Sequence, residues 1–277
     1  MSAHHLPASP AELNDLYTRL RQAADEPPHE GSLPLWVARH RCGWITPPAC
    51  AALRPMAGVR HLDDRVELGH ALAPGAALNA VLAEAAEHLR VADCVRGWRN
   101  ELLDILPVDG TPSIGAIERA AVRPLGLLTR AVHLNAWTPD GRMWIARRSL
   151  SKTSDPGLWD TLVGGLASSG EALDLSLLRE CDEEAGLAPA DLLGRTPLRT
   201  ICRMHRRLPE GLQIEDLLTS TVVLALSVAP CNRDGEVMEI RHESVDTVFE
   251  MMQAGLFTEE AMLVIVEDML FRCKEPA

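Results

Sequence analysis

The sequence predicts an α/β (α+β) protein in which a mixed β-sheet is sandwiched between helices and is preceded by a small mixed α/β unit. Two observations lead to this fold class. Strand-like segments stand both before and after one central helix within residues 168–186, and an amphipathic helix over residues 258–271 closes the chain. Such an order is typical of a sheet that packs against helices. The sequence texture changes near residue 120, so we expect an N-terminal domain at 1–120 and a second domain at 121–277.

The expected N-terminal domain combines helices with short strands. Ser9 and Pro10 form a helix start, and apolar residues then recur at helical spacing up to Leu20. The apolar segments 35–37 and 43–45 predict short strands. Two more helices are expected, at residues 47–53 and 76–89. This domain contains no repeat and no motif with an evident chemical role.

The expected second domain begins with two strands joined by a turn. The apolar residues 125–137 predict the first strand, Pro139-Asp140-Gly141 the turn, and residues 143–146 the next strand. A strand over 161–165 ends in the glycine pair Gly164-Gly165 and precedes the central helix. Later strands are expected at residues 217–228 and 236–240, and Thr258 is the expected N-cap of the closing helix.

The composition and net charge of the chain indicate which classes of binding partner to expect. The chain has 277 residues, 47% hydrophobic and 24% charged, which is ordinary for a globular protein with a core. Its formal net charge of −12 disfavours nucleic acid and anionic membranes as partners. The seven cysteines are odd in number and form no C-x-x-C pair, so neither a disulfide framework nor a zinc site is predicted.

The expected location is cytoplasmic. Residues 1–5 show no basic segment followed by an apolar one, which a secretory signal requires. The longest aliphatic run, residues 222–229, is far shorter than a membrane-spanning helix. The sequence leaves a homodimer open.

The central helix carries an unusual density of acids in the stretch RECDEEAGL, residues 179–187. Ser168 followed by Glu171 matches a capping box, which predicts the start of this helix. Gly186 in the left-handed C′ position, with Pro189 beyond it, predicts its end. A helix of roughly four to five turns is therefore expected.

Three of these acids, Glu180, Glu183 and Glu184, stand at positions i, i+3 and i+4 and share one helix face. By itself such a face is more often a solvated surface than a metal site. Its context favours metal, because Arg179 stands four residues before Glu183 and can pair with it. A carboxylate cluster near a glycine whose backbone is exposed supplies oxygen ligands, which suit Mg²⁺ or Mn²⁺. Asp182 points elsewhere and is expected in solvent.

The segment from Gly165 to Leu187 resembles the Nudix box, G-x5-E-x7-R-E-U-x-E-E-x-G-U, where U is aliphatic. Every fixed position is filled, by Gly165, Glu171, Arg179, Glu180, Glu183, Glu184 and Gly186. Cys181 stands where an aliphatic residue is usual. The resemblance implies a Nudix-type fold and a metal-dependent hydrolase of organic diphosphates.

What the resemblance implies for single residues is specific. Glu180, Glu183 and Glu184 would supply most of the metal contacts, Arg179 would orient one of them, and Gly165 would offer its carbonyl. Glu171 would be structural. A general base from the box, Glu183 or Glu184, is the favoured hypothesis. The candidates outside the box are Glu215 and Glu236.

Two further segments, residues 118–137 and 143–166, resemble the Nudix proteins related to the domain fused to thiamine pyrophosphokinase in some fungi. That group carries an N-terminal extension, which residues 43–55 resemble. The resemblance implies hydrolysis of thiamine diphosphate, or of an oxidised analogue, to the monophosphate and phosphate. The small-molecule diphosphate is the expected partner.

Substrate contacts are predicted from composition around the box. Arg147, Arg148 and Lys152 form a basic cluster that could bind the terminal phosphate, although a solvated turn explains each one equally well. All six tryptophans precede the box and could stack on a heteroaromatic ring, but core packing is the commoner role. His133 and His205 are interpreted as packed or surface residues.

Two alternative functions stay open. One is a Nudix hydrolase of nucleotides, such as ADP-ribose, NADH or oxidised nucleoside triphosphates. The other is a non-catalytic Nudix domain that senses a ligand, although an intact set of three glutamates disfavours it. Isopentenyl diphosphate isomerases share the fold but usually have a degenerate box, so they rank lower.

Overall fold

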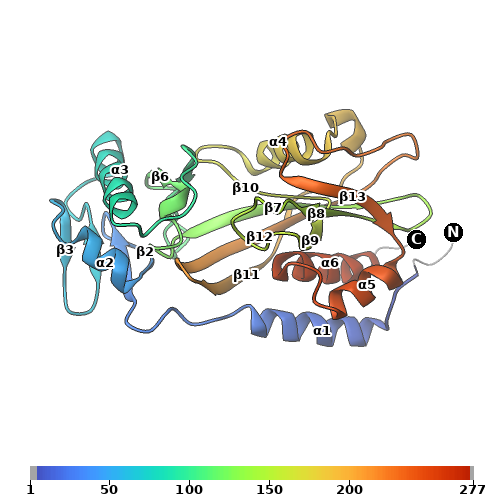
Figure 1. Ribbon diagram of the computed structural model, residues 1–277, viewed down its shortest axis with the longest axis horizontal. Helices are drawn as coiled ribbons and strands as arrows, with labels where there is room; N and C mark the ends of the chain where they lie inside the picture. The colour runs from blue at the N-terminus through green and yellow to red at the C-terminus, as the bar shows by residue number, and fades with distance from the viewer. Residues whose placement is uncertain (1–4, 275–277) are drawn as a thin grey trace.

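Two lobes lie side by side along the long axis of the computed structural model, which describes residues 5–274 (Figure 1). The smaller lobe holds most of the N-terminal half of the chain, and the larger lobe holds a wide sheet with helices on both faces. The prediction that no secretory signal is present concerns residues 1–5, of which 1–4 lie outside the described range.

The smaller lobe is built on a four-stranded sheet in the order β2-β1-β4-β3. Its strands are β1 (Leu33–Val37), β2 (His40–Ile45), β3 (Val59–His61) and β4 (Val66–Leu68). The other elements are α2 (Pro47–Leu53), α3 (Ala76–Val91), the antiparallel pair β5 (Leu102–Asp104) and β6 (Ala116–Glu118), and the short 3-10 helix η1 (Arg119–Ala121). Thr46 is the N-cap of helix α2, its side chain accepts from the Ala49 N–H, and Pro47 is the first residue of the helix.

The larger lobe is built on a seven-stranded mixed sheet in the order β11-β12-β7-β8-β13, with β10 paired to β7 and β9 paired to β8. The strands are β7 (Leu128–Trp137), β8 (Met143–Arg148), β9 (Trp159–Thr161), β10 (Val163–Leu166), β11 (Arg199–Leu208), β12 (Gly211–Val223) and β13 (Val237–Glu243). The helices are α4 (Leu173–Ala185), α5 (Val245–Gln253), α6 (Glu259–Arg272) and the 3-10 helix η2 (Pro189–Leu192). Helix α4 covers one face of the sheet and α6 the other, which confirms the predicted fold class (Figure 1).

Helix α1 (Pro10–Ala23) lies along α6 in the larger lobe, although it precedes the smaller lobe in the sequence (Figure 1). Its Leu13 is fully buried in one cluster with Trp137 and Ile265. Ser9 caps the helix as predicted. The domain boundary at residue 120 stays a prediction. The chain also passes from the larger lobe to the smaller one earlier, between α1 and β1. None of the helices within residues 5–274 is long and apolar enough to cross a membrane.

Several elements differ from the sequence-based expectation. Strands β3, β4, β5 and β6 of the smaller lobe were not predicted. In the larger lobe, strands β9 and β11 and helix α5 were not predicted, and β12 covers Gly211–Val223 rather than 217–228. β11 lies at the edge of the sheet, and its several arginines obscure the alternation of apolar side chains. β12 pairs in parallel with β7, and the two strands end together at Val223 and Trp137. The apolar run beyond Val223 therefore leaves the sheet.

Candidate active site

Helix α4 begins later than predicted. Its N-cap is Ala172, which has no side-chain cap, so the capping box expected from Ser168 and Glu171 is wrong. The helix has 13 residues, fewer than four turns. Its end is as predicted, because Gly186 has φ 63° and a Cβ there would lie 2.9 Å from the Cys231 carbonyl oxygen.

Glu171 instead fixes the position of Arg179. The carboxylate of Glu171 accepts hydrogen bonds from Nε and Nη2 of Arg179, each at 3.1 Å, and from the Ser176 hydroxyl at 2.7 Å. These bonds hold the pKa of Glu171 below its usual range. A bidentate contact of this kind keeps a guanidinium in one orientation. Glu171 is therefore a support for the arginine and lies in the turn before the helix.

Arg179 in turn holds two acids of the helix. Its Nη1 donates to Glu180 Oε1 at 2.8 Å and to Glu183 Oε2 at 3.1 Å, which confirms the predicted pairing with Glu183. Burial raises the pKa of Glu180, and the charge of Arg179 acts in the opposite direction. One cation therefore offsets the repulsion between neighbouring carboxylates on the same helix face.

The glycine pair of β10 lies directly beneath this face. The N–H of Gly164 donates to Glu184 Oε2 at 2.9 Å. A Cβ on Gly165 would overlap the carboxyl group of Glu180, so any side chain at this position would displace that acid. The two glycines thus let Glu180 and Glu184 approach the strand closely.

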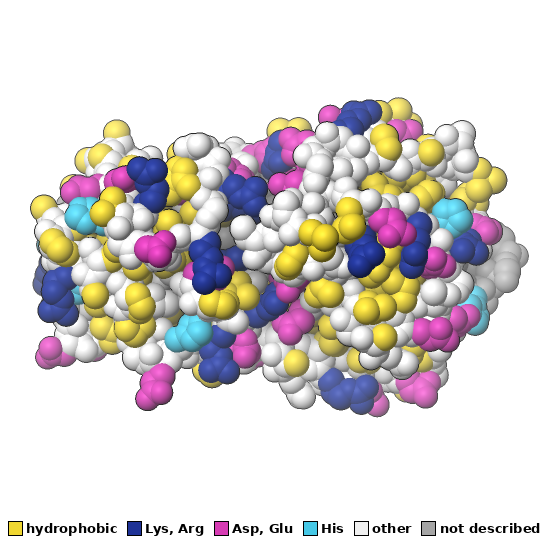
Figure 2. Space-filling view, in the orientation of Figure 1, with side chains coloured by type: hydrophobic (Ala, Val, Ile, Leu, Met, Phe, Trp, Pro, Cys, Tyr) yellow, Lys and Arg dark blue, Asp and Glu magenta, His cyan; other side chains and the backbone are white. Residues whose placement is uncertain are grey.

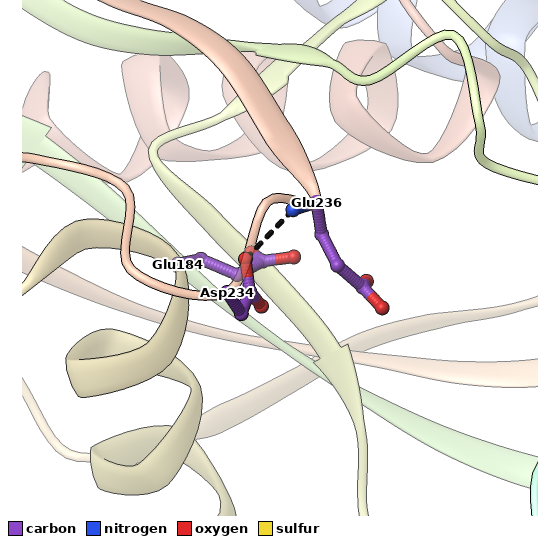
Figure 3. Close-up of side chains that lie close together, drawn as sticks. All are labelled: Glu184, Asp234 and Glu236. Atoms are coloured by element: carbon purple, nitrogen blue, oxygen red, sulfur yellow. Dashed lines mark hydrogen bonds between the residues drawn. The ribbon is translucent and has the colours of Figure 1, made fainter.

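The third acid, Glu184, turns away from Arg179 and meets a second pair of acids. The loop before β13 brings Asp234 and Glu236 to it, and one carboxylate oxygen from each of the three lies within 4.8 Å of the others (Figure 3). Oδ1 of Asp234 accepts from the Glu236 N–H at 2.8 Å (Figure 3). Asp234 was not predicted as a ligand. The D-G-E sequence before a strand is the one signal that could have pointed to it.

The ammonium of Lys152 lies against two of these acids. It is 3.4 Å from Glu184 Oε1 and also forms an ion pair with Glu236. Burial raises the pKa of Glu184 to about 8, whereas the bond and charge of Lys152 outweigh burial and lower the pKa of Glu236. The acids therefore already hold one positive charge, that of Lys152, and their side chains offer oxygen ligands. These residues fit a hard divalent ion such as Mg²⁺ or Mn²⁺.

A cavity of about 150 Å³ opens beside these acids, between the two lobes. One wall comes from the smaller lobe and carries the arginines Arg96, Arg99, Arg119 and Arg123. Three of them form ion pairs, Arg99 with Glu236, Arg119 with Glu101 and Arg123 with Glu210. Figure 2 shows basic side chains along the boundary between the lobes. The opposite wall comes from the sheet, the glycine pair and Glu236. The smaller lobe thus contributes directly to the cavity.

The three basic residues predicted for the substrate do not all reach this cavity. Arg148 and Lys152 line it, and Arg148 is paired with Asp160 at 3.0 Å. Arg147 does not, because successive residues of a strand point to opposite faces of the sheet. Its Nε donates to the Gly157 carbonyl at 2.9 Å, and its guanidinium lies over the Trp159 ring. We leave Arg147 out of the candidate site.

The tryptophans are also absent from the cavity wall within the described part of the chain. Trp137 and Trp159 belong to the core of the larger lobe, and Nε1 of Trp137 donates to the buried Asp268 at 2.8 Å. Trp44 and Trp98 of the smaller lobe lie beneath arginine side chains. The structure therefore places no tryptophan where it could stack on a ligand in this cavity.

Glu215 reaches the cavity from β12. It is 5% exposed, accepts from the Thr129 hydroxyl at 2.9 Å and from Gln213 Nε2 at 3.3 Å. Burial, together with the charge of Glu260, raises its pKa to about 7. This candidate from outside the box thus faces the same cavity as Glu236.

Comparison with known proteins divides the chain between two family models. Residues 127–260 match the NUDIX domain, and residues 15–129 match a domain of unknown function (DUF4743).

Two relatives come from Arabidopsis thaliana. Nudix hydrolase 24, chloroplastic, is 31% identical over 182 residues, which cover 64% of this chain and 49% of the relative. Nudix hydrolase 20, chloroplastic, is 30% identical over 209 residues, which cover 70% and 55% respectively. The chain thus spans about half the length of these curated relatives. Among solved structures, DR0079 from Deinococcus radiodurans aligns with 63% of this chain and 100% of its own, at 21% identity and a TM-score of 0.46.

Proposed function

We propose that this chain, which carries a NUDIX domain at residues 127–260, is a divalent-metal-dependent hydrolase of a small organic diphosphate. One observation carries the proposal. The acids Glu184, Asp234 and Glu236 gather beside a cavity that Glu236 lines and whose other wall carries four arginines. Carboxylates that bind a cation, facing arginines that bind phosphate, form a site for a metal-bound diphosphate.

Each side of the cavity has its own role in this proposal. Glu180, Glu183 and Glu184, with the carbonyl of Gly165 and the oxygens of Asp234 and Glu236, hold Mg²⁺ or Mn²⁺. When bound, the cation neutralises phosphate charge and lowers the pKa of a coordinated water. Arg179 positions the carboxylates of the helix. The arginine wall of the smaller lobe, with Arg148 and Lys152, binds phosphate oxygens.

We assign the general base to Glu183. A base must reach the attacking water, and the Glu183 side chain is 45% exposed, whereas that of Glu184 is 6% exposed and is bonded to the Gly164 N–H. Glu184 is the alternative within the box. Glu215 and Glu236, which line the cavity, are the alternatives outside it.

Replacing Glu183 tests both the metal role and the base role. We expect Glu183→Gln to lower kcat about 100-fold, since it removes a charged ligand and the proton acceptor. The matched control is Asp182→Asn, because Asp182 is an exposed neighbour on the same helix and pairs with Arg233 outside the cavity. Unchanged turnover of Glu183→Gln in saturating Mg²⁺ would show that the role assigned to the helix is wrong.

The substrate class is tested by a panel. The resemblance in residues 118–166 supports thiamine diphosphate or an oxidised analogue, with the monophosphate and phosphate as products. Nucleotides such as ADP-ribose, NADH and oxidised nucleoside triphosphates are the second class. Product release from each compound with Mg²⁺ separates them, and a preference for nucleotides would refute the thiamine assignment. Tight binding of a compound without any turnover would favour a ligand sensor.

The cellular location and the assembly state also belong to this proposal. We propose a cytoplasmic enzyme, although the two Arabidopsis relatives are named chloroplastic. Fractionation of cells that express the full gene tests the location. Light scattering of the purified chain tests whether it forms a homodimer.

A further inference from the structure

A second cavity lies beside the first at the boundary between the lobes. Its volume is about 370 Å³, against about 150 Å³ for the cavity beside the acids. Two residues, Arg96 and Glu210, line both cavities, so the two spaces meet along these side chains. Pockets for small organic ligands usually have about 300–1,000 Å³. The first cavity falls below this range, whereas the second has room for the organic group of a diphosphate.

Segments from both lobes form the second cavity. The smaller lobe contributes residues 46–48 at the start of α2 and residues 92–94 after α3. The larger lobe contributes Pro209 and Glu210, in the turn between β11 and β12 that reaches the smaller lobe (Figure 1). Residues 46–48 belong to the segment 43–55, to which the proposed function assigns no role.

The lining of the second cavity suits a flat ring without negative charge. Its apolar part consists of three prolines together with an alanine and a cysteine, namely Pro47, Pro48, Pro209, Ala92 and Cys94. Proline rings offer flat apolar surfaces on which a planar ring can pack. The carboxylate of Asp93 disfavours an anionic group in this cavity, and the charge of Glu210 is paired with Arg123 at 2.7 Å. The second cavity therefore fits the organic group rather than the diphosphate.

Arg96 differs from the other three arginines of the first cavity. Arg99, Arg119 and Arg123 each form an ion pair with a carboxylate. Within residues 5–274 the side chain of Arg96 forms neither an ion pair nor a hydrogen bond. Its full charge is therefore available to an anion, and it lies where the two cavities meet.

We infer that the second cavity is the subsite for the organic group of the substrate, a flat heterocyclic ring, and that Arg96 binds the phosphate next to that group. The diphosphate then lies in the first cavity, beside the acids, and the chain of the substrate passes Arg96 on its way to the second cavity. Because the diphosphate belongs to the site described above, this inference rests on the proposed function.

Diphosphates with organic groups of different size test the subsite. The small probe is methyl diphosphate, and the bulky probes are thiamine diphosphate and ADP-ribose. Affinity is measured by calorimetry with Ca²⁺ in place of Mg²⁺ to slow turnover. We expect the wild-type protein to bind at least one bulky probe about 10-fold more tightly than methyl diphosphate. Burial of roughly 60 Å² of apolar ring surface, at about 25 cal/mol per Å², corresponds to this ratio.

Ala92→Trp places an indole in the second cavity. We expect the preference for the bulky probe to fall to about twofold or less, because the indole takes the space of the ring. The affinity for methyl diphosphate should stay within about twofold of the wild type, since this probe does not enter the second cavity. Ala92 is exposed, so the larger side chain does not disturb the core. The matched control is Ala83→Trp, at an exposed position of α3 that lines neither cavity, and it should keep the wild-type preference.

Arg96→Gln tests the phosphate contact. We expect it to weaken the binding of methyl diphosphate and of the bulky probe alike, by about 10-fold, because both carry the phosphate that Arg96 binds. The matched control is Arg54→Gln, since Arg54 is an exposed arginine of the same lobe that lines neither cavity. Arg54→Gln should bind all probes as the wild type does, and the melting temperatures of both variants should equal that of the wild type.

The outcomes separate this inference from the proposed function. Equal affinity of the wild-type protein for all three probes, or a preference that survives in Ala92→Trp, would overturn the subsite. Absence of binding by all three probes would overturn it as well, and unchanged affinities of Arg96→Gln would overturn the phosphate contact. A preference that only Ala92→Trp abolishes, without hydrolysis of any diphosphate in Mg²⁺, would support the subsite and refute the hydrolase. Hydrolysis without any preference for a bulky probe would do the reverse.

Discussion

Replacing Glu215 with glutamine should change how the free energy of unfolding depends on pH. In the folded protein burial raises the pKa of this carboxyl to about 7, against 4.5 for the same group in an unfolded chain. Between these two values the folded state keeps a proton that the unfolded state has released. The stability of the wild-type protein therefore falls as pH rises through this window. Below pH 4.5 both states are protonated and the group has no effect.

The size of the effect follows from the two pKa values. They differ by about 2.5, which corresponds to about 3 kcal/mol at pH values above 7. Glutamine resembles the protonated carboxyl in shape and does not titrate. The Thr129 hydroxyl can accept from the new amide, because it can donate instead to the Ile214 carbonyl at 3.1 Å. We expect Glu215→Gln to match the wild type near pH 4.5 and to exceed it by up to about 3 kcal/mol at pH 8.

Urea unfolding curves at pH 4.5, 6 and 8, recorded without divalent ions, measure this difference. The raised pKa of Glu184 is common to both proteins and cancels in the comparison. Asp182→Asn is the control, since Asp182 is exposed and its variant should follow the wild-type profile at all three values. A difference between Glu215→Gln and wild type that stays constant from pH 4.5 to 8 would refute the reasoning.

Three further predictions concern the candidate site. Arg179→Lys keeps the positive charge but loses the planar guanidinium that orients three carboxylates. The Mg²⁺ concentration for half-maximal activity should therefore rise about 10- to 100-fold, and an unchanged value would contradict this role. Gly165→Ala places a Cβ on the Glu180 carboxyl and should lower the free energy of unfolding, measured in urea, by about 1–3 kcal/mol; an unchanged free energy would contradict the clash with Glu180. Arg99→Gln, on the cavity wall, should raise KM about 10-fold while the melting temperature stays constant, and an equal KM would remove Arg99 from substrate binding.

The local elements of the fold could be predicted because their signals are local. Ser9 and Thr258 cap their helices as expected, and Gly186 ends α4. The pairing of Arg179 with Glu183 follows from one turn of helix. The prediction of the start of α4 failed because the same local pattern is compatible with two different contacts of one side chain. The spacing of Ser168 and Glu171 matched a capping box, but the carboxylate of Glu171 binds Arg179 instead. A sequence pattern cannot distinguish an acid that caps a helix from one that pairs with an arginine.

The sequence by itself determined the acidic helix, the glycine strand beneath it and the chemistry that they indicate, because helix and strand periodicity depend on neighbouring residues. Only the tertiary structure decided what faces them. Asp234 meets Glu184 across 50 residues of chain, and the arginine wall comes from the other lobe. Arg147 and Arg148 separate only once β8 is placed in its sheet. Such contacts depend on how distant segments pack, and the burial of hydrophobic residues determines that packing. The polar residues that it brings together therefore show no sequence pattern from which their contact could be predicted.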